Sequence, residues 1–308
     1  MFLGYTIENV EDIAANEVDG KVIAKKRIIF KKTKKEYFCL NRVMEISVEG
    51  NCEDLKSIEE LCKKFKEKCK ESISVDCIRE GDHGFKSVDI QKIAAGVFAK
   101  KGYTIDFKNP CKVIGMDVFN NQVKIGFIIA DKLCRREYRI KINNQSVNGC
   151  LAAICALAAG VGKKDVVVDP LCKDGVIAIE IAKQGAKKVY AFDPLKNNTR
   201  NAKVNIQVAK VEVNARTKDI SWLETEFKKN EITKVVTNAF IGKYDKTTEG
   251  NIKELFRQAE NVVKESVTIL TNDPQGIKNC AENFTINKEW NVIVGDMTYG
   301  LIIFKKKS

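Results

Sequence analysis

The stretch VVVDPLCKDGVIAIEIAKQGAKKVYAFDP, residues 166–194, determines the fold class of this chain. Its pattern predicts a buried strand over 166–168, a helix over 176–184 and a second strand over 188–192. The same alternation of helix and strand continues to about residue 271. Strands joined by helices form right-handed units with parallel strands, so we expect a doubly wound parallel sheet in the second half of the chain.

Other expected elements surround this stretch. In the second half we expect helices over 146–159, 197–209, 222–229 and 251–263, strands over 211–214, 234–236 and 267–271, and a hairpin of 291–294 with 299–304. The first half predicts an α+β mixture, with helices over 10–17, 55–71 and 88–101 and strands over 2–6, 44–48, 72–78, 104–107, 112–118 and 122–130. A further hairpin is expected to pair 21–30 with 36–40 across the basic turn 31–35. Two segments of different character therefore meet near residues 140–146.

Length and composition set limits on the class of protein. At 308 residues the chain has room for about two domains of roughly 100–200 residues each, and its 44% apolar content supports real cores. No apolar run reaches the ~20 residues of a membrane span, and no signal peptide is expected. The 11 cysteines are scattered, no two form Cys-x-x-Cys, and His83 is the only histidine. We therefore expect no metal site, reduced thiols and a cytoplasmic location.

The charge balance is strongly basic. Lysine and arginine number 53 against 41 aspartates and glutamates, a formal net charge of +12. The surplus divides equally, +6 in residues 1–141 and +6 in residues 142–308, and it is densest in DKLCRREYRIK, residues 131–141. A basic surface serves solubility as well as nucleic-acid binding, so the charge alone leaves both interpretations open.

Polar residues stand at the ends of consecutive predicted strands. Asp169 to Gly175 follow the first strand, Asp193 the second, Asp219 the third, and Thr237 to Gly242 the fourth. In a doubly wound sheet these ends share one edge, where nucleotide-like ligands bind, and an acidic residue about 20 positions after a glycine-bearing turn often binds ribose. Each feature alone is better explained as a helix cap or a turn. Together they favour a nucleotide-like cofactor site.

Three segments of the chain resemble one family. They are the opening MFLGYTIENVEDIAANEV (residues 1–18), REGDHGFKSVD (79–89) and RREYR (135–139). They are similar to the opening, the THUMP signature and the basic-aromatic interdomain segment of the THUMP-containing, S-adenosylmethionine-dependent RNA methyltransferases, especially the tRNA guanine-N2 group. The resemblance covers nearly the whole chain, and within it His83 is better explained as a structural residue than as a catalytic one.

The resemblance also assigns roles in the catalytic half. The family's loop Asp-Pro-x-Cys-Gly-Ser-Gly-Thr is matched by Asp169, Pro170, Cys172 and Gly175, whereas Lys173, Asp174 and Val176 replace Gly, Ser and Thr. The substituted side chains would stand where the backbone approaches the cofactor, and Asp174 would place negative charge near the methionine carboxylate. By resemblance, Asp169 and Gly175 bind the cofactor, Asp193 its ribose and Asp219 its adenine.

The family's catalytic turn, Asn-Pro-Pro followed by Tyr or Phe, is reduced to Asn238-Ala239-Phe240-Ile241. The resemblance implies that Asn238 orients the substrate amine and that an aromatic ring stacks on the flipped base. Phe240 is the aromatic residue available, one position early. Loss of both prolines should loosen the turn.

The resemblance implies a domain plan and two functions. It implies a ferredoxin-like part at 1–50, a THUMP-like RNA-binding domain at 51–141 and a Rossmann-like methyltransferase domain at 142–308. The expected partner is tRNA, and a small activating protein subunit stays open. The implied RNA contacts are Arg79, Lys86, Lys132, Arg135, Arg136, Arg139 and Lys141, with further basic residues at 21–35. One function is methyl transfer from S-adenosylmethionine to guanine N2. The alternative is a catalytically weakened or inactive protein that serves as a tRNA-binding module. A DNA adenine-N6 methyltransferase shares the Asn-Pro-Pro turn, but the THUMP-like half argues against it.

Overall fold

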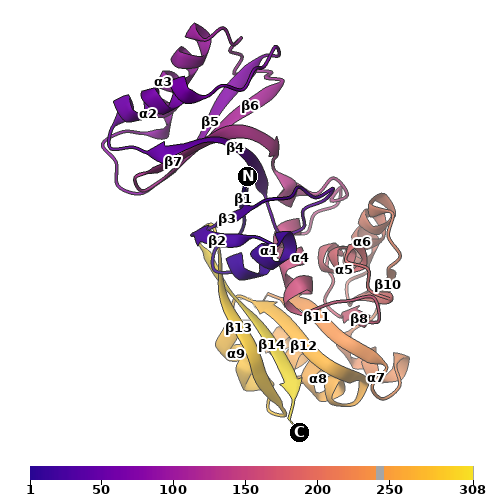
Figure 1. The fold of residues 1–308 in the computed structure, drawn as a ribbon. Helices are drawn as coiled ribbons and strands as arrows, with labels where there is room; N and C mark the ends of the chain where they lie inside the picture. Colours follow the sequence, from indigo (N-terminus) through magenta and orange to yellow (C-terminus); the bar gives the residue numbers. More distant parts are fainter. Residues whose placement is uncertain (241–245, 308) are drawn as a thin grey trace.

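The computed structural model of this chain describes residues 1–240 and 246–307, and in them it contains two seven-stranded sheets. The first sheet has the strand order β2-β3-β1-β4-β7-β6-β5 and the second β10-β9-β8-β11-β12-β14-β13. The two sheets lie at opposite ends of an elongated molecule, joined through α1 and α4 (Figure 1). No helix in the described residues is long and apolar enough to span a membrane.

The first sheet is formed entirely by the N-terminal half. Its strands are β1 (Phe2–Tyr5), β2 (Lys21–Ala24), β3 (Arg27–Phe30), β4 (Arg42–Asn51), β5 (Ile73–Glu80), β6 (Lys112–Phe119) and β7 (Gln122–Ala130). Its helices are α1 (Glu11–Val18), α2 (Leu55–Lys64) and α3 (Ser87–Lys100). Strand β4 pairs with β1 on one side and with β7 on the other. Because β4 is shared, the region before residue 50 and the region after it form one continuous sheet.

The predicted hairpin of 21–30 with 36–40 is wrong. The hairpin joins β2 to β3 through a tight turn in which Lys26 is left-handed, with φ of 62°. Residues 36–40 form no strand, because the Glu17 carboxylate accepts hydrogen bonds from the backbone N–H groups of Phe38 and Cys39 at 2.6 and 2.7 Å. These bonds use donors that a sheet would need.

Helix α2 is shorter than its amphipathic pattern predicts. It begins at an Asp54 cap, whose side chain accepts from the Ser57 N–H at 2.7 Å, and it ends at Lys64 rather than Glu71. Phe65 leaves the helix in an extended conformation and is fully buried against Phe98 and Phe127. Burial of this ring in the core under α2 and α3 therefore outweighs continuation of the helix.

The second sheet confirms the predicted fold class. Its strands are β8 (Val166–Asp169), β9 (Lys188–Asp193), β10 (Asn214–Thr217), β11 (Ile232–Ala239), β12 (Val263–Thr271), β13 (Phe284–Val294) and β14 (Met297–Lys306). Its helices are α4 (Gly149–Ala158), α5 (Val176–Lys183), α6 (Lys196–Ala209), α7 (Leu223–Glu226), α8 (Lys246–Val262) and α9 (Pro274–Cys280), with 3₁₀ turns η1 (Leu133–Arg135) and η2 (Ile220–Trp222). Strands β8 to β12 are parallel, and β14 and β13 add antiparallel at one edge.

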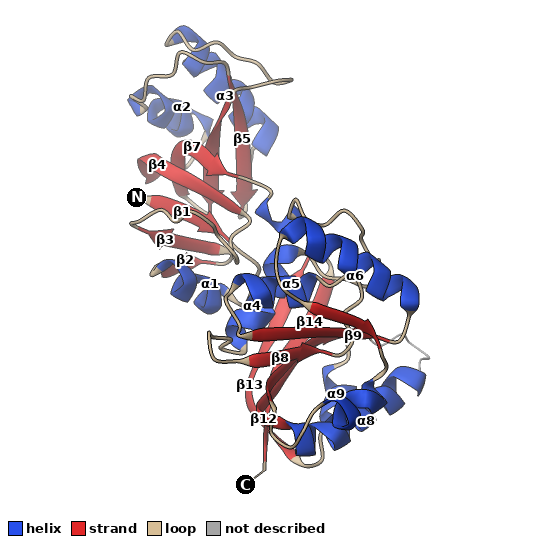
Figure 2. Ribbon diagram, turned by 90° about the vertical axis from the view of Figure 1, so that its right-hand side faces the viewer, coloured by secondary structure: helices blue, strands red, loops and turns tan. Residues whose placement is uncertain are grey.

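Helices cover both faces of this sheet, as Figure 2 shows. The apolar helix α4 is buried along its length, and it contacts α5 on one side and α1 of the N-terminal half on the other. One hydrophobic core therefore runs from α1 through α4 and α5 into the second sheet. Tyr138 and Val147 of the linker, residues 131–148, belong to this core, which holds the linker against the second half of the chain.

The strand order also locates the ligand crevice. From β8 the chain proceeds outward to β9 and β10, and then returns to the other side of β8 to form β11 and β12. The direction of winding reverses between β8 and β11. Open α/β sheets bind ligands at this switch point, beyond the carboxyl ends of the strands.

Candidate active site and nucleic-acid interface

The predicted strand-end residues all lie at the carboxyl edge of the second sheet. Asp169 ends β8, Asp193 ends β9, Asp219 follows β10, and Asn238 stands one residue before the end of β11. Because these strands are parallel, the four side chains approach the same edge. Asp169 and Asn238 flank the switch point itself.

Asp169 is a buried carboxylate in this crevice. It is 1% exposed, and it accepts hydrogen bonds from the Thr237 hydroxyl at 2.7 Å and from the Leu171 N–H at 3.3 Å. Burial raises the pKa of Asp169 to about 7, against the lowering effects of the Thr237 bond and of Lys173. The carboxylate thus titrates near neutral pH within a closed polar network.

Lys173 crosses the crevice from the loop after β8 to the end of β11. Its side chain is nearly buried, and its Nζ donates to the backbone carbonyl of Asn238 at 2.5 Å. Its backbone is left-handed, with φ of 50°, at the position where the family has glycine. The resemblance showed that Lys173 replaces a glycine of the family's loop. No pattern in the neighbouring sequence predicted its contact with Asn238.

Asp193 is held by three donors of this chain. Its Oδ2 accepts from the Lys173 N–H at 2.9 Å, and its Oδ1 accepts from the Leu195 N–H and from Asn198 Nδ2 at 2.9 and 3.0 Å. A carboxylate has about four acceptor sites, so it retains capacity for one further donor. Next to it, the side chain of Leu195 is 61% exposed and presents an apolar surface at the sheet edge.

Gly175 is required where the loop meets α6. Its φ is 81°, and a Cβ atom there would lie 3.0 Å from the Cβ of Ala202. The left-handed conformation and this close approach both favour glycine. Gly175 therefore sets the distance between the loop and α6.

Asp174 does not place a free negative charge at the crevice, and that expectation is corrected. It is fully buried and faces the linker, where it accepts from Arg139 Nη2 at 3.0 Å, from the Ser146 hydroxyl and from the Asn143 N–H at 3.3 Å. The Arg139 guanidinium balances its charge. Asp174 thus ties the linker to the loop that precedes α5.

Asn238 presents an unpaired acceptor inside the crevice. Its Nδ2 donates to the carbonyl of Gln145 at 3.0 Å, whereas its Oδ1 is buried without a hydrogen-bond partner. Strand β11 continues regularly through this turn, with Asn238 opposite Leu270 and Ala239 opposite Thr271. Phe240 is half-buried just beyond the strand, and Ile241 and Gly242 lie outside the described residues.

Asp219 is exposed at the start of η2. Its side chain accepts from the Ser221 N–H at 2.8 Å and from the Ser221 hydroxyl. Close by, the Lys218 ammonium lies 3.4 Å from the centroid of Trp222, which is 41% exposed. Asp219 therefore has a capping role in this structure, and it stays accessible at the sheet edge.

The basic linker divides into buried and exposed cations, which corrects part of the predicted RNA-binding set. The side chains of Arg136 and Arg139 are each 7% exposed and form ion pairs with Glu180 and Asp174. Arg136 also donates to the carbonyls of Phe38 and Leu133 at 2.7 and 2.9 Å. Both guanidiniums are used inside the protein and do not belong to an exposed phosphate-binding surface.

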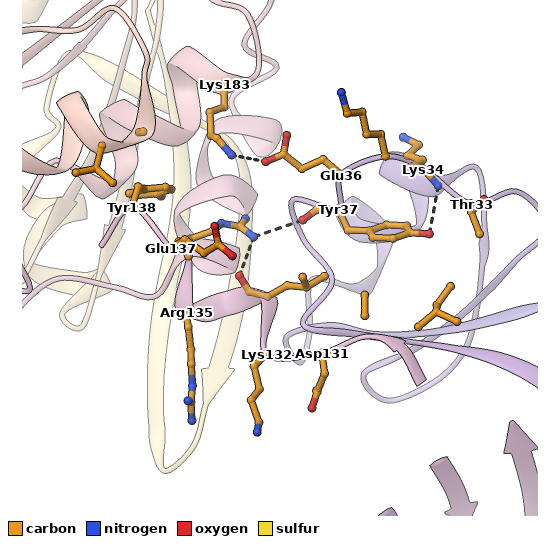
Figure 3. A pocket seen from close by; sticks show the side chains of 17 residues that line it. Thr33, Lys34, Glu36, Tyr37, Asp131, Lys132, Arg135, Glu137, Tyr138 and Lys183 are labelled. Atoms are coloured by element: carbon orange, nitrogen blue, oxygen red, sulfur yellow. Dashed lines mark hydrogen bonds and ion pairs between the residues drawn. The ribbon is translucent and has the colours of Figure 1, made fainter. Parts of the chain in front are cut away.

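Lys132, Arg135 and Lys141 are exposed on the same linker. Lys132 and Arg135 border a cavity of about 660 Å³ at the junction of the two halves, and Figure 3 shows them extending in the same direction from it. Its other lining residues include Lys34, Lys35, Glu36, Tyr37, Tyr138 and Lys183. Lys183 pairs with Glu36 across the junction. We call the exposed residues Lys35, Lys132, Arg135 and Lys141 the junction cations; the first three line this cavity, and Lys141 lies further along the linker.

The segment that resembles the THUMP signature forms a structural loop. His83 contacts Arg79 Nη1 through Nδ1 at 2.9 Å and the carbonyl of Asn120 through Nε2 at 2.7 Å, and its ring packs on Phe85. These contacts agree with the structural interpretation of His83. Arg79 is half-buried in this network, whereas Lys86 is exposed at the start of α3.

Comparisons with known proteins agree with this architecture. A family model described as "RMKL-like, methyltransferase domain" matches residues 136–298, and the THUMP domain model matches residues 52–127. No curated protein sequence matches the chain.

Solved structures resemble the whole chain. TrmN from Thermus thermophilus is 18% identical, with a TM-score of 0.85 and coverage of 99% of each chain. A protein described as a possible methylase from Clostridium difficile 630 is 18% identical, with a TM-score of 0.83 and coverage of 100% of this chain and 98% of that one. SMU.472, determined in complex with SAH, is 15% identical, with a TM-score of 0.78 and coverage of 100% and 98%. At these identities the likeness establishes the fold.

Proposed function

The chain belongs to the family defined by the RMKL-like methyltransferase domain, and from this we propose that it is a tRNA methyltransferase that transfers a methyl group from S-adenosylmethionine to the exocyclic N2 of a guanine. The THUMP domain at residues 52–127 and the junction cations support RNA as the substrate class. The likeness to TrmN, by the name of that protein, favours tRNA.

The unpaired Oδ1 of Asn238 is the observation that carries this proposal. A buried acceptor without a partner destabilises the fold by on the order of 1–3 kcal/mol. We therefore infer that a ligand donates a hydrogen bond to Asn238 Oδ1 when it binds. An amino group is such a donor. The bond from Nδ2 to the Gln145 carbonyl holds the amide so that Oδ1 stays available to it. Asn238 would orient the lone pair of the amine without removing its proton.

The crevice suits a cofactor that carries positive charge. The carboxylates of Asp169 and Asp193 and the carbonyl of Asn238 already surround one cation, the ammonium of Lys173. S-adenosylmethionine is a sulfonium cation, and when bound it supplies the methyl group. Asp193 would hold the ribose, the exposed Leu195 and Asp219 would border the adenine, and the turn at Gly175 would allow close backbone approach.

RNA would be bound across the junction of the two halves. The junction cations offer phosphate contacts, and none of Lys35, Arg135 and Lys141 forms an ion pair within the described residues. Phosphate contacts position an RNA by shape without reading its sequence. From the junction, the linker continues to the loop after β8, to which Arg139 is joined by its ion pair with Asp174.

The experiment is a transfer assay with the full chain. The protein is incubated with unmodified tRNA and methyl-labelled S-adenosylmethionine, and the digested nucleosides are identified by mass spectrometry. The expected product is N2-methylguanosine. Label at adenine N6 would contradict the proposed specificity, and no label with retained tRNA binding would contradict the proposed activity.

One observation favours a second function, a tRNA-binding module without transfer. Strand β11 remains paired with β12 through Ala239, where the family has the first of two prolines. Backbone groups that the family's turn presents to the substrate are therefore part of a regular strand here. In this case the chain would bind tRNA as tightly as an active enzyme and yield no methylated product.

A further inference from the structure

The side chain of Lys173 occupies the crevice in which the proposed cofactor would bind. The crevice between β8 and β11 is where this fold binds its ligand, and both of its walls contribute polar groups: Asp169 from β8 and Asn238 from β11. Lys173 joins these walls, because its loop follows β8 and its Nζ reaches the carbonyl of Asn238 at 2.5 Å. Its ammonium thus lies inside the crevice rather than beside it.

The backbone of Lys173 is under strain in this position. A φ of 50° is uncommon for a residue with a side chain, and glycine adopts it at no steric cost. The N–H of Lys173 nevertheless donates to Asp193 Oδ2 at 2.9 Å, which fixes the loop in this conformation. A lysine is therefore held where the loop geometry favours glycine.

The charges around the ammonium explain how it is retained. Burial lowers the pKa of Lys173, whereas the carboxylates of Asp169 and Asp193 oppose that effect. Asp174, which follows Lys173 in the loop, is paired with Arg139 on the linker. The negative groups that face the crevice are thus balanced by Lys173 alone among the described residues.

We propose that Lys173 is an internal competitor of the cofactor: its ammonium occupies the crevice that the sulfonium of S-adenosylmethionine requires, and it opposes the binding of that cation. This inference rests on the proposed function, since it assumes that cofactor. Two like charges in one buried crevice repel strongly, and the butyl-amine chain takes up room as well. The intact chain should therefore bind S-adenosylmethionine weakly. Lys173 should weaken the binding of the uncharged product, S-adenosylhomocysteine, to a smaller extent.

The test compares the binding of S-adenosylmethionine and S-adenosylhomocysteine by calorimetry, using the full chain. Lys173→Gly removes both charge and bulk, and it should tighten binding of both ligands about tenfold or more. Lys173→Met keeps the bulk and removes the charge, so it should improve the sulfonium ligand more than the thioether. Lys210→Gly is the matched control, because Lys210 is also left-handed, with φ of 54°, but it is exposed at the end of α6.

The outcomes separate the two proposals. Equal affinities in Lys173→Gly and the unchanged protein would overturn the competitor role and leave the proposed function standing. If neither ligand binds to the unchanged protein or to any variant, while tRNA binding is intact, S-adenosylmethionine is not the cofactor and both proposals are wrong. If Lys173→Gly does not give a cooperative unfolding transition, the test rests on Lys173→Met. The measured quantity is then the ratio of its affinities for S-adenosylmethionine and S-adenosylhomocysteine, compared with the ratio in the unchanged protein. An unchanged preference there would also overturn the proposal.

Discussion

Arg136 of the linker and Glu180 of α5 form a bidentate ion pair, in which Nε donates to Oε1 at 2.8 Å and Nη2 donates to Oε2 at 3.1 Å. Glu180 is fully buried, and the Tyr138 hydroxyl donates to the same carboxylate at 2.5 Å. The pair joins the chain that leaves the N-terminal half to α5, the helix that follows the first strand of the second sheet. The basic linker is therefore an anchored segment with charged groups on its outer side.

Replacement of Arg136 by methionine should destabilise the protein by about 3 kcal/mol or more, because it leaves the Glu180 charge buried and unpaired. Arg136→Met together with Glu180→Met should recover most of that loss. Urea unfolding measures both effects. Lys183→Ala is the control, since its pair with the exposed Glu36 should contribute about 1 kcal/mol or less. A single variant as stable as the control would contradict the anchoring role.

The junction cations make a prediction for RNA binding. Joint replacement of Lys132, Arg135 and Lys141 by alanine should weaken tRNA binding and reduce the slope of log affinity against log salt by about 2 to 3, at roughly 0.7–0.9 per lost phosphate contact. Filter binding over a salt series gives the slope.

A control with the same loss of charge keeps this measurement specific. Lys228, Lys229 and Lys305 are exposed on the second half and lie away from the junction cavity. Their joint replacement by alanine should leave most of the slope intact. Similar slopes for the two triple variants would place the RNA elsewhere on the basic surface.

Asp169 makes the stability of the protein depend on pH. Burial raises the pKa of Asp169 in the folded protein to about 7, from a usual value of 3.8. An acid with a raised folded pKa contributes stability that is full below about pH 4 and is lost as the pH rises through 7. About three pKa units correspond to at most about 4 kcal/mol.

Asp169→Asn should therefore flatten the fall in unfolding free energy between pH 4 and pH 7. Urea titrations at several pH values compare it with the unchanged protein and with Asp82→Asn, which alters an exposed carboxylate. A pH dependence in Asp169→Asn that matches the unchanged protein would assign the titration to another group.

Asn238 makes a kinetic prediction that follows from the proposed function. Asn238→Ala removes the acceptor that orients the amine, so kcat for methyl transfer should fall about 100-fold, while the affinity for the cofactor changes little. Steady-state kinetics and calorimetry provide the two measurements. Asn287→Ala, on the exposed face of β13, should behave as the unchanged protein. A rise in KM without loss of kcat would make Asn238 a binding residue only.

Much of the fold was predictable because it follows from local patterns. The alternation of apolar strands and amphipathic helices over residues 166–271 predicts the parallel sheet, and β8, α5 and β9 lie within a residue of their expected ends. The wrong hairpin has a local cause: Lys26 takes the left-handed turn position that glycine or asparagine usually marks. The carboxylate of Glu17, about 20 residues away, then keeps residues 36–40 out of the sheet.

The site was predictable in outline, since strand order alone brings Asp169, Asp193 and Asn238 to one edge. The partners of its charged groups were not. Arg136 pairs with a carboxylate 44 residues away and Arg139 with one 35 residues away, so the basic run looked exposed in the sequence. The contact of Lys173 with Asn238 spans 65 residues and depends on the order of β8 and β11. Such contacts follow from tertiary packing and leave no local pattern.

Strand β4 has a practical consequence for any attempt to divide the protein. It lies outside the residues that match the THUMP model, yet its pairing with β7 covers an edge of that domain. A fragment that begins at residue 52 would leave the backbone donors and acceptors of β7 open to pairing with another chain, and such edges promote aggregation. A fragment that begins at Met1 keeps this edge covered by β4 and is the unit to express for binding studies of the N-terminal half.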